Sequence, residues 1–201
     1  ALSGIVVLWL SGVNIKYFIY TFLIFIISAP FVISILKPYQ KLRILTFFNP
    51  SKDPLGAGYQ VIQSKIAVGS GGILGKGFLK GTQSYLEFLP EKHTDFIFTL
   101  FAEEYGLIGA LFLLMIYGIT IYRIILIGSS SRSFFAKIFC YSFASAIFIY
   151  ISINMSMVLG LLPIVGSPLP IMSYGGSSIL ATMVGFSVVI SAKIYHRQSI
   201  S

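Results

Sequence analysis

The chain has 201 residues, of which 56% are hydrophobic and only 10% are charged. This balance, with a mean hydropathy of +0.90, excludes an ordinary soluble domain and is typical of a protein with several membrane-spanning segments. The formal net charge of +8 does not indicate a nucleic-acid-binding protein, because the basic residues stand singly between apolar segments. The single cysteine, Cys140, excludes a disulfide framework and a cysteine-based zinc site.

Six hydrophobic segments are predicted to be helical, so the expected fold is an all-α bundle of transmembrane helices. A span needs about 20 apolar residues to cross ~30 Å of hydrocarbon. The first segment is too short to cross, and we expect residue 1 to lie inside a truncated helix. The six predicted segments are 1–12 (truncated), 17–36, 59–79, 96–121, 134–159 and 171–192.

The connector between the second and third segments, KPYQKLRILTFFNPSKDPLGAGYQ, is rich in turn-forming residues. Its basic groups suit the anionic head groups of membrane lipids. The third segment, 59–79, is the least apolar, because it carries Lys65, two glutamines and a run of glycines. A segment of this composition cannot face lipid on all sides.

The distribution of basic residues favours a membrane crossing by the segment 59–79. If the segment crosses, nine basic residues lie on one side of the membrane, four lie on the other side, and Lys65 lies within the membrane. If it does not cross, eight basic residues lie on one side and six on the other. The positive-inside rule then places the larger group and the carboxy terminus in the cytoplasm, and an outer loop at 76–95. The larger group is Lys37, Lys41, Arg43, Lys52, Arg123, Arg132, Lys137, Lys193 and Arg197.

Lys76 and Lys80 stand four residues apart in the sequence GKGFLKG of this outer loop. They would share one helical face, or lie on adjacent turns of a glycine-rich loop that lets a bulky anion approach the backbone. The loop does not contain a Walker motif, because no strand precedes it and the G-K-[ST] ending is absent.

Asp95 lies where the outer loop meets an apolar segment, in the sequence LPEKHTDFIF. It could cap the first turn of the following helix. Capping alone, however, does not explain the neighbouring Glu91, Lys92 and His93. His93 is expected to form hydrogen bonds at the membrane interface, since the only other histidine, His196, lies on the opposite side.

Glu103 and Glu104 follow Asp95 by eight and nine residues, about two turns into the apolar segment. Carboxylates at this depth usually face the interior of a bundle, as pathway residues or as paired charges. We expect Lys65 to be the structural counter-ion of these two glutamates. An equally weighted alternative is that Lys65 binds a phosphate group.

The stretch LPIVGSPLPIMSYGGSS combines three prolines with three glycines at membrane depth. Irregular backbone is tolerated there only where it is buried in protein or lines a wet cavity. We interpret it as a re-entrant elbow that shapes the bundle, in preference to a direct substrate contact.

The sequences NPSKDPLGAGYQVIQSKIAVGSGGILGKGFLKGTQSYLEFLPEKHTDFIFTLFAEEYG and LPIVGSPLPIMSYGGSS resemble the carboxy-terminal half of the SEDS family. Within that family, GKGFLKGTQSYLEFLP resembles the RodA branch more than the FtsW branch. The resemblance implies a peptidoglycan glycosyltransferase of the bacterial inner membrane that polymerises lipid II on the outer face during cell elongation and shape maintenance. It also implies a bundle of ten helices, of which this chain would hold about six, and a class B penicillin-binding protein as partner.

The resemblance places the family's proposed catalytic aspartate on Asp95. An inverting transfer needs a base for the acceptor hydroxyl and positive charge for the departing pyrophosphate. A divalent cation such as Mg²⁺ or Mn²⁺ could supply part of the positive charge for the pyrophosphate, although no metal ligands can be assigned. The alternatives are a lipid II flippase or a non-catalytic scaffold for the penicillin-binding protein, and activity of this part of the chain alone is not implied. The candidate substrate-binding residues are Lys76, Lys80, Gln83, Glu91 and His93.

Overall fold

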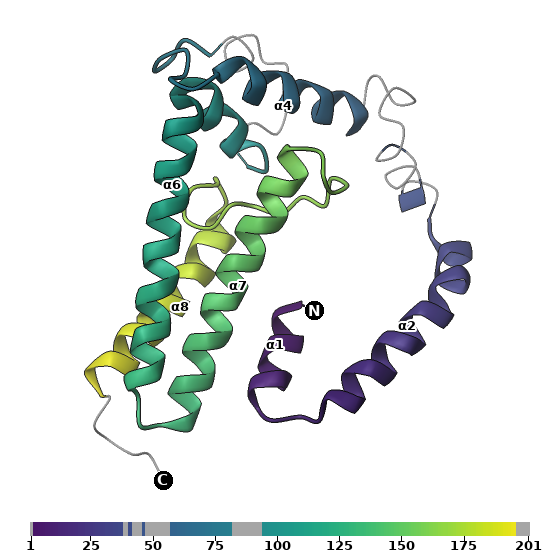
Figure 1. The fold of residues 1–201 in the computed structure, drawn as a ribbon, viewed down its shortest axis with the longest axis vertical. Helices are drawn as coiled ribbons and strands as arrows, with labels where there is room; N and C mark the ends of the chain where they lie inside the picture. The colour runs from purple at the N-terminus through teal and green to yellow at the C-terminus, as the bar shows by residue number, and fades with distance from the viewer. Residues whose placement is uncertain (1, 38–39, 42–45, 47–56, 82–93, 196–201) are drawn as a thin grey trace.

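The computed structural model describes residues 2–37, 40–41, 46, 57–81 and 94–195 (Figure 1). The regular structure in these ranges is entirely helical and contains no strand, which confirms the all-α expectation. The helices are α1 (Leu2–Leu10), α2 (Ile15–Ile35), α4 (Ala57–Gly71), α6 (Ile97–Ser130), α7 (Phe134–Val158) and α8 (Gly176–Ile194).

α6, α7 and α8 pack side by side and form a three-helix bundle (Figure 1). In the described ranges, these three helices are long and apolar enough to cross a membrane. Small residues bring them together: Gly128 of α6 lies against Cys140 of α7, and Gly185 of α8 lies against the ring of Phe143. Close backbone approach at small residues is the usual way in which helices associate inside a bilayer.

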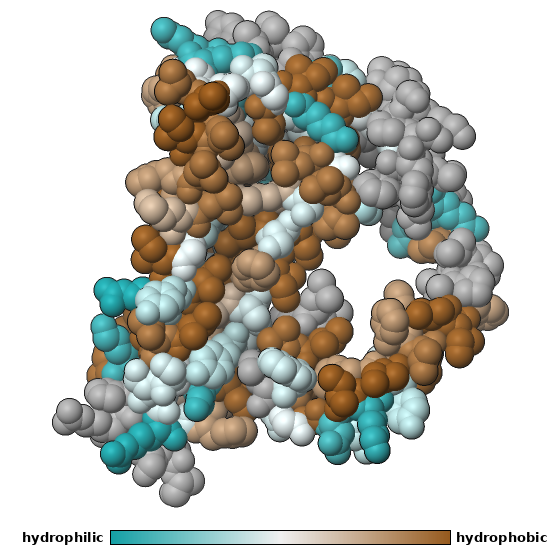
Figure 2. Space-filling view, viewed as in Figure 1, coloured by the Kyte–Doolittle hydropathy of each residue, from teal (hydrophilic) through white to brown (hydrophobic). Residues whose placement is uncertain are grey.

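The outer faces of the helices are covered by large apolar side chains (Figure 2). The exposed side chains of α2 are almost all apolar, as are those on the outer face of α6. In water such a surface would be unfavourable, but in a bilayer it matches the solvent. The surface therefore agrees with the expectation of a membrane protein.

Apart from the segment 59–79, two helix bounds differ by five residues or more from the sequence-based expectation. α6 continues nine residues beyond 121, to Ser130, because the apolar segment passes through Arg123 without a helix-breaking residue. α8 begins at Gly176 instead of 171, because Ile171 has a positive φ of 69° that a helix cannot contain. The non-helical connection between α7 and α8 (residues 159–175) is hereafter the elbow.

The predicted span over 59–79 is corrected by the structure. The helix there, α4, has only 15 residues and ends at Gly71, so it is about 22 Å long and too short for the ~30 Å of hydrocarbon. α4 lies across the end of α6 and α7 instead of running beside them (Figure 1). Because the charge distribution favoured one orientation only if this segment crossed, the sidedness of the loops stays a prediction.

α4 is fixed to the end of α7 by a buried hydroxyl. Ser64 Oγ donates a hydrogen bond of 2.8 Å to the carbonyl oxygen of Val158, the last residue of α7. The last carbonyls of a helix have no partner within that helix, so this bond satisfies one of them. Ser64 is one of the polar residues that made the segment 59–79 unsuitable for facing lipid, and the structure places it against the helix bundle.

Candidate active site

α6 is sharply broken at Gly106, whose φ of 67° and ψ of −163° are not helical. The break separates a short arm (residues 97–105) from the long part of the helix (residues 107–130). Figure 1 shows the arm as a separate helical segment beside the end of α6. In an unbroken helix, the carbonyls of Glu103 and Glu104 would accept hydrogen bonds from the residues four positions later. The break makes those carbonyls available to other donors.

The turn that follows α4 provides these donors. We name residues 72–77 the glycine turn, and its backbone bonds to both sides of the break. Lys76 N donates to Glu103 O (3.1 Å), Gly77 N to Glu104 O (3.0 Å), Leu107 N to Gly72 O (2.9 Å) and Ile108 N to Ile73 O (3.2 Å). Backbone groups inside a membrane protein need such partners, so the glycine turn substitutes for the interrupted helix.

Two positions of this junction require glycine. A Cβ on Gly106 would lie 2.6 Å from Ile73 O, and a Cβ on Gly75 would lie 2.5 Å from the carbonyl carbon of Glu104. Both residues also have positive φ, 67° and 79°, which side chains disfavour. One of our two expectations for GKGFLKG was that its glycines let an anion approach the backbone; at Gly75 the structure places the backbone of α6 there instead.

Lys76 and Glu103 form an ion pair, with 2.7 Å between Lys76 Nζ and Glu103 Oε1. The Glu103 side chain is fully buried, whereas that of Lys76 is 27% exposed. The carboxylate thus faces the protein interior, as expected for an acid at this depth. Its partner is not Lys65 as predicted, because the glycine turn brings Lys76 over the arm.

Lys65 lies away from the two glutamates. Its exposed side chain packs against Gly160 of the elbow, where a Cβ would lie 2.6 Å from Lys65 Nζ. Within the described ranges it forms no ion pair. The predicted pairing of Lys65 with Glu103 or Glu104 is therefore wrong, and binding of phosphate by Lys65 stays a prediction.

The remaining charged residues of this region lie at the surface or near it. Glu104 is half-buried on the arm, one residue after the ion-paired Glu103. Lys80 is exposed, and its backbone N–H donates to Gly77 O at 3.1 Å in the turn that follows the glycine turn. Lys76 and Lys80 do not share a helical face, since the backbone between them forms turns.

Asp95 is half-buried, and its backbone is held by residues of α7 and the elbow. Its backbone carbonyl accepts a hydrogen bond of 2.8 Å from Asn154 Nδ2 of α7. The preceding carbonyl, that of Thr94, accepts a bond of 2.6 Å from Ser173 Oγ of the elbow. The carboxylate lies against Gly166, where a Cβ would be 3.3 Å from Asp95 Oδ2. The backbone that carries the carboxylate is thereby held by α7 and the elbow.

Asp95 does not cap the helix that follows it. The N-cap residue of α6 is Phe96, and no side chain accepts a hydrogen bond there. The Phe96 side chain is 1% exposed and belongs to the hydrophobic core. Burial of Phe96 therefore anchors the start of the arm, and capping does not explain why an aspartate stands beside it.

The elbow is tied down by its own hydrogen bonds and by those from two helices. Asn154 Nδ2 also donates to Ser167 O at 2.7 Å, and Tyr117 Oη of α6 donates to Pro170 O at 2.6 Å. Within the elbow, Leu169 N donates to Ser173 Oγ at 2.6 Å. These bonds satisfy irregular backbone at membrane depth, as the interpretation of a structural elbow requires.

Three residues of this site were not found by reasoning from the sequence: Asn154, Ser173 and Tyr117. Asn154 offered a signal, since it is the only amide side chain in the apolar segment ISINMSMV and a polar residue there usually has a specific partner. The partner itself was not predictable, because Asp95 lies 59 positions away. A serine or tyrosine in such a segment carries a weaker signal.

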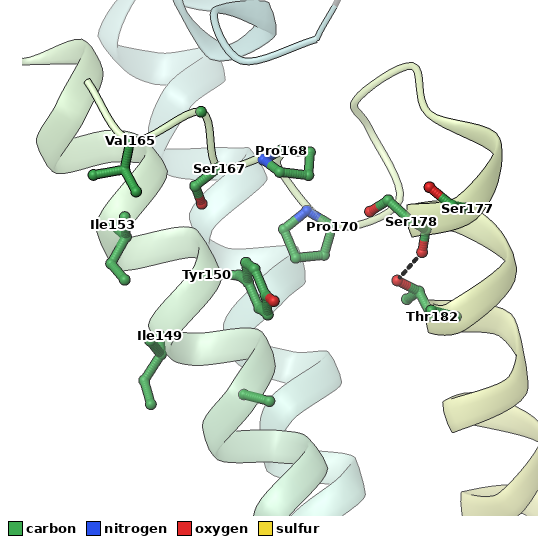
Figure 3. Close-up of a pocket in the computed structure, with 13 residues that line it drawn as sticks. Ile149, Tyr150, Ile153, Val165, Ser167, Pro168, Pro170, Ser177, Ser178 and Thr182 are labelled. Carbon is green, nitrogen blue, oxygen red and sulfur yellow. Dashed lines mark hydrogen bonds between the residues drawn. The ribbon is translucent and has the colours of Figure 1, made fainter. Parts of the chain in front are cut away.

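A cavity of about 640 Å³ opens beneath the elbow, between α7 and α8 (Figure 3). Its walls on α7 are mostly apolar, while hydroxyl groups line it from the elbow and the first turns of α8. Gly166 lines the cavity, and a Cβ on this glycine would lie 3.3 Å from Asp95 Oδ2, so a residue of the lining lies next to the aspartate. The hydroxyl-bearing residues of the lining are Tyr150, Ser167, Ser177, Ser178 and Thr182.

Three of the candidate substrate-binding residues, Gln83, Glu91 and His93, lie outside the described residues. Within the described ranges, no group of three or more histidine, cysteine, aspartate or glutamate side chains gathers to hold a metal ion. The described side chains around Asp95 therefore do not form a metal-ligand set by themselves.

Residues 1–198 match the family model of the FtsW, RodA and SpoVE proteins, which is described as a cell cycle protein. The chain belongs to this family. The match covers nearly the whole chain and confirms the resemblance on which the sequence-based expectation rested.

Several members of the FtsW/RodA/SpoVE family are similar to the chain over most of its length. The peptidoglycan glycosyltransferase MrdB of Escherichia coli is 45% identical over 202 residues, which cover 100% of this chain and 54% of that protein. The stage V sporulation protein E of Bacillus subtilis is 37% identical over 96% of this chain and 52% of its own length. The chain thus spans about half the length of these relatives.

Two solved structures have a related fold. The first comes from work on the structural coordination of polymerization and crosslinking by a peptidoglycan synthase complex. The match covers 98% of this chain and 54% of the chain in that structure, with a TM-score of 0.77 and 32% sequence identity. The second is an aspartate-to-alanine mutant of the rod shape determining protein RodA of Thermus thermophilus, with a TM-score of 0.53 and 31% identity over 63% of this chain and 39% of its own.

Proposed function

We propose that the intact protein is a peptidoglycan glycosyltransferase that polymerises lipid II on the outer face of the cytoplasmic membrane during cell elongation. Family membership and the names of relatives such as MrdB support this assignment. The observation that carries it is the position of Asp95, whose carboxylate lies next to Gly166 of the cavity lining and whose backbone is held by α7 and the elbow.

Asp95 is the proposed general base. Lipid II carries a disaccharide on a polyprenyl pyrophosphate, and transfer of the sugar requires removal of a proton from the acceptor hydroxyl. A base must be held in place for this step, because small displacements of a catalytic group strongly reduce the rate. The hydrogen bonds to the carbonyls of Thr94 and Asp95 fit that requirement.

The departing pyrophosphate needs positive charge close to where its negative charge develops. Lys80 is exposed in the loop that leads toward Asp95, and Lys76 is partly exposed beside Glu103. We propose Lys80 as the main contact, because Lys76 already neutralises Glu103. Contacts by Gln83, Glu91 and His93 belong to the same proposal.

A divalent cation remains an addition to this proposal. The described residues gather no set of three metal-binding side chains, and Glu91 and His93, which precede Asp95, lie outside the described ranges. Mg²⁺ or Mn²⁺ bound by Asp95 would take most of its ligands from the pyrophosphate and from water.

A class B penicillin-binding protein is the proposed partner. One of the structural matches comes from a peptidoglycan synthase complex that coordinates polymerization with crosslinking. A polymerase of this family would pass its glycan product to a crosslinking enzyme, so the two would form one assembly in the membrane.

The decisive experiment measures polymerisation of purified lipid II by the intact protein together with its partner. Asp95→Asn removes the proposed base with little change in shape, and we expect the rate to fall at least about 100-fold. Glu104→Gln makes the same chemical change on the neighbouring arm and should retain most of the activity. Polymerisation at a near wild-type rate by a folded Asp95→Asn variant would refute the assignment of Asp95.

The same variants separate the two alternative functions. A flippase would move labelled lipid II between the leaflets of a liposome without making glycan strands. If the protein is a scaffold, its Asp95→Asn variant should still support normal cell shape. Either result would replace the glycosyltransferase proposal.

A further inference from the structure

Of the described residues that line the cavity beneath the elbow, none is charged. Side chains of α7, including Ile149 and Ile153, form an apolar wall, and the ring of Tyr150 lies between them (Figure 3). Hydroxyl groups of the elbow and of α8 border the same space. A pyrophosphate needs positive charge where it binds, so this lining does not suit one. It fits a neutral molecule that combines hydroxyl groups with apolar faces, which is the chemistry of a sugar.

The volume of the cavity also suits a sugar. Cavities that bind small ligands commonly measure about 300 to 1,000 Å³, and this one measures about 640 Å³. In the proposed reaction, the reacting sugar of the donor is attached to a pyrophosphate. The reacting hydroxyl of the acceptor instead lies on a terminal sugar, away from the pyrophosphate of its own molecule. An uncharged lining therefore favours the acceptor over the donor.

Ser167 contributes a buried hydroxyl to this lining. The residue is 7% exposed, and its Oγ has no hydrogen-bond partner among the described residues. A buried hydroxyl without a partner is unfavourable, and such groups are rare in folded proteins. Figure 3 shows this hydroxyl pointing from the elbow toward Tyr150, another residue of the lining. A serine side chain moves between staggered rotamers, so the hydroxyl can turn to meet a molecule in the cavity.

One side chain holds the backbones of both Ser167 and Asp95. Asn154 Nδ2 donates to Ser167 O at 2.7 Å and to Asp95 O at 2.8 Å. An amide nitrogen has two hydrogen atoms, so these two bonds use both. Gly166, the neighbour of Ser167, lies where a Cβ would be 3.3 Å from Asp95 Oδ2. Ser167 is therefore fixed relative to Asp95 at the edge of the cavity.

We propose that this cavity binds the terminal sugar of the acceptor, and that the hydroxyl of Ser167 forms a hydrogen bond with that sugar. The sugar then presents its reacting hydroxyl to Asp95, and the ring of Tyr150 lies against an apolar face of the sugar. The pyrophosphate of the donor binds outside this cavity. This inference rests on the proposed glycosyltransferase function and adds the binding site of one of its two substrates.

The test uses two modified substrates with the intact protein and its partner. The donor is lipid II with its acceptor hydroxyl blocked, and the acceptor is the methyl glycoside of the lipid II disaccharide, so each substrate has only one role. Ser167→Ala should raise the KM for the acceptor about three- to tenfold, as expected for the loss of one neutral hydrogen bond. The KM for the donor and kcat should change less than about twofold, because only binding of the acceptor is weakened.

The matched control is Ser187→Ala on α8. It removes a hydroxyl that bonds to Met183 O within its own helix and lies outside the cavity lining. Both KM values of this variant should stay within about twofold of the wild type. Equal effects of the two serine variants, or a rise in the KM for the donor instead of the acceptor, would overturn the proposal.

Binding of the methyl glycoside without donor, measured by ligand-observed NMR, tests the cavity independently of sugar transfer. If the wild type transfers no sugar and Ser167→Ala still weakens this binding, the proposed function fails and the sugar site is supported. If the wild type and Ser167→Ala bind the glycoside equally, the sugar site fails whatever the activity.

Thermal unfolding separates substrate binding from a structural role of the hydroxyl. Because Ser167 Oγ has no partner in the described structure, Ser167→Ala should leave the unfolding temperature unchanged or raise it slightly. A clear decrease would assign the hydroxyl to a bond within the protein, for example to Asn154 Oδ1, which also lacks a partner among the described residues. That result would overturn the proposal.

Discussion

Lys76 Nζ lies 2.7 Å from Oε1 of the fully buried Glu103, and this ion pair joins the glycine turn to the arm that begins two residues after Asp95. The two residues are 27 positions apart in the sequence. Because the arm is cut off from the rest of α6 at Gly106, its position depends on such contacts with the glycine turn. The ion pair therefore contributes to the placement of the proposed base.

Lys76→Met should destabilise the protein, because it removes the cation beside a buried carboxylate. Breaking a fully buried pair costs about 3 to 5 kcal/mol, and the partial exposure of Lys76 reduces our expectation to about 2 kcal/mol. Thermal unfolding in detergent measures the effect. Lys80→Met removes an exposed lysine four residues later and should leave the unfolding temperature nearly unchanged; equal effects would contradict the structural role of the pair.

Gly106→Ala should disturb the break in α6. At a φ of 67° and a ψ of −163°, a backbone region essentially restricted to glycine, an alanine costs about 1 to 3 kcal/mol, and its Cβ would also lie 2.6 Å from Ile73 O. We expect a lower unfolding temperature and reduced lipid II polymerisation by the intact protein. The control is Gly118→Ala on the same helix, where a Cβ meets nothing within 4 Å and should be neutral or slightly stabilising.

Asn154→Leu should affect both stability and activity. It removes the hydrogen bonds to Asp95 O and Ser167 O, each worth about 1 kcal/mol, and leaves both carbonyls without that donor. The rate of lipid II polymerisation should fall by more than the loss of folded protein explains, because Asp95 loses a contact that positions it. Ser145→Ala is the control on α7, since its hydroxyl bonds only to Ser142 O within the helix. Normal activity of folded Asn154→Leu would show that Asp95 does not need this support.

Tyr117→Phe should loosen the elbow. The hydroxyl of Tyr117 donates to Pro170 O at 2.6 Å in a buried position, and its loss should cost about 1 kcal/mol. Limited proteolysis of the elbow and thermal unfolding both report the change. Tyr122→Phe, at an exposed position five residues later on α6, should behave like the wild type in both measurements.

The sequence alone determined the class of the fold and suggested Asp95 as the catalytic residue, which stays a proposal. Hydropathy and segment length are local properties, so they predicted α7, α8 and most of α6 as membrane-spanning helices. Asp95 was identified because the sequence HTDFIF resembles a family motif, and the family is confirmed by the match over residues 1–198. The depth of Glu103 also followed from spacing along one helix.

The tertiary structure decided which residues meet. The pairing of Glu103 with Lys76 instead of Lys65, and the support of Asp95 by Asn154 and Ser173, connect positions separated by 27 to 79 residues. No helical period relates such positions. They depend on the break at Gly106 and on the direction of α4, which are set by close backbone packing between segments and not by the hydropathy of either one.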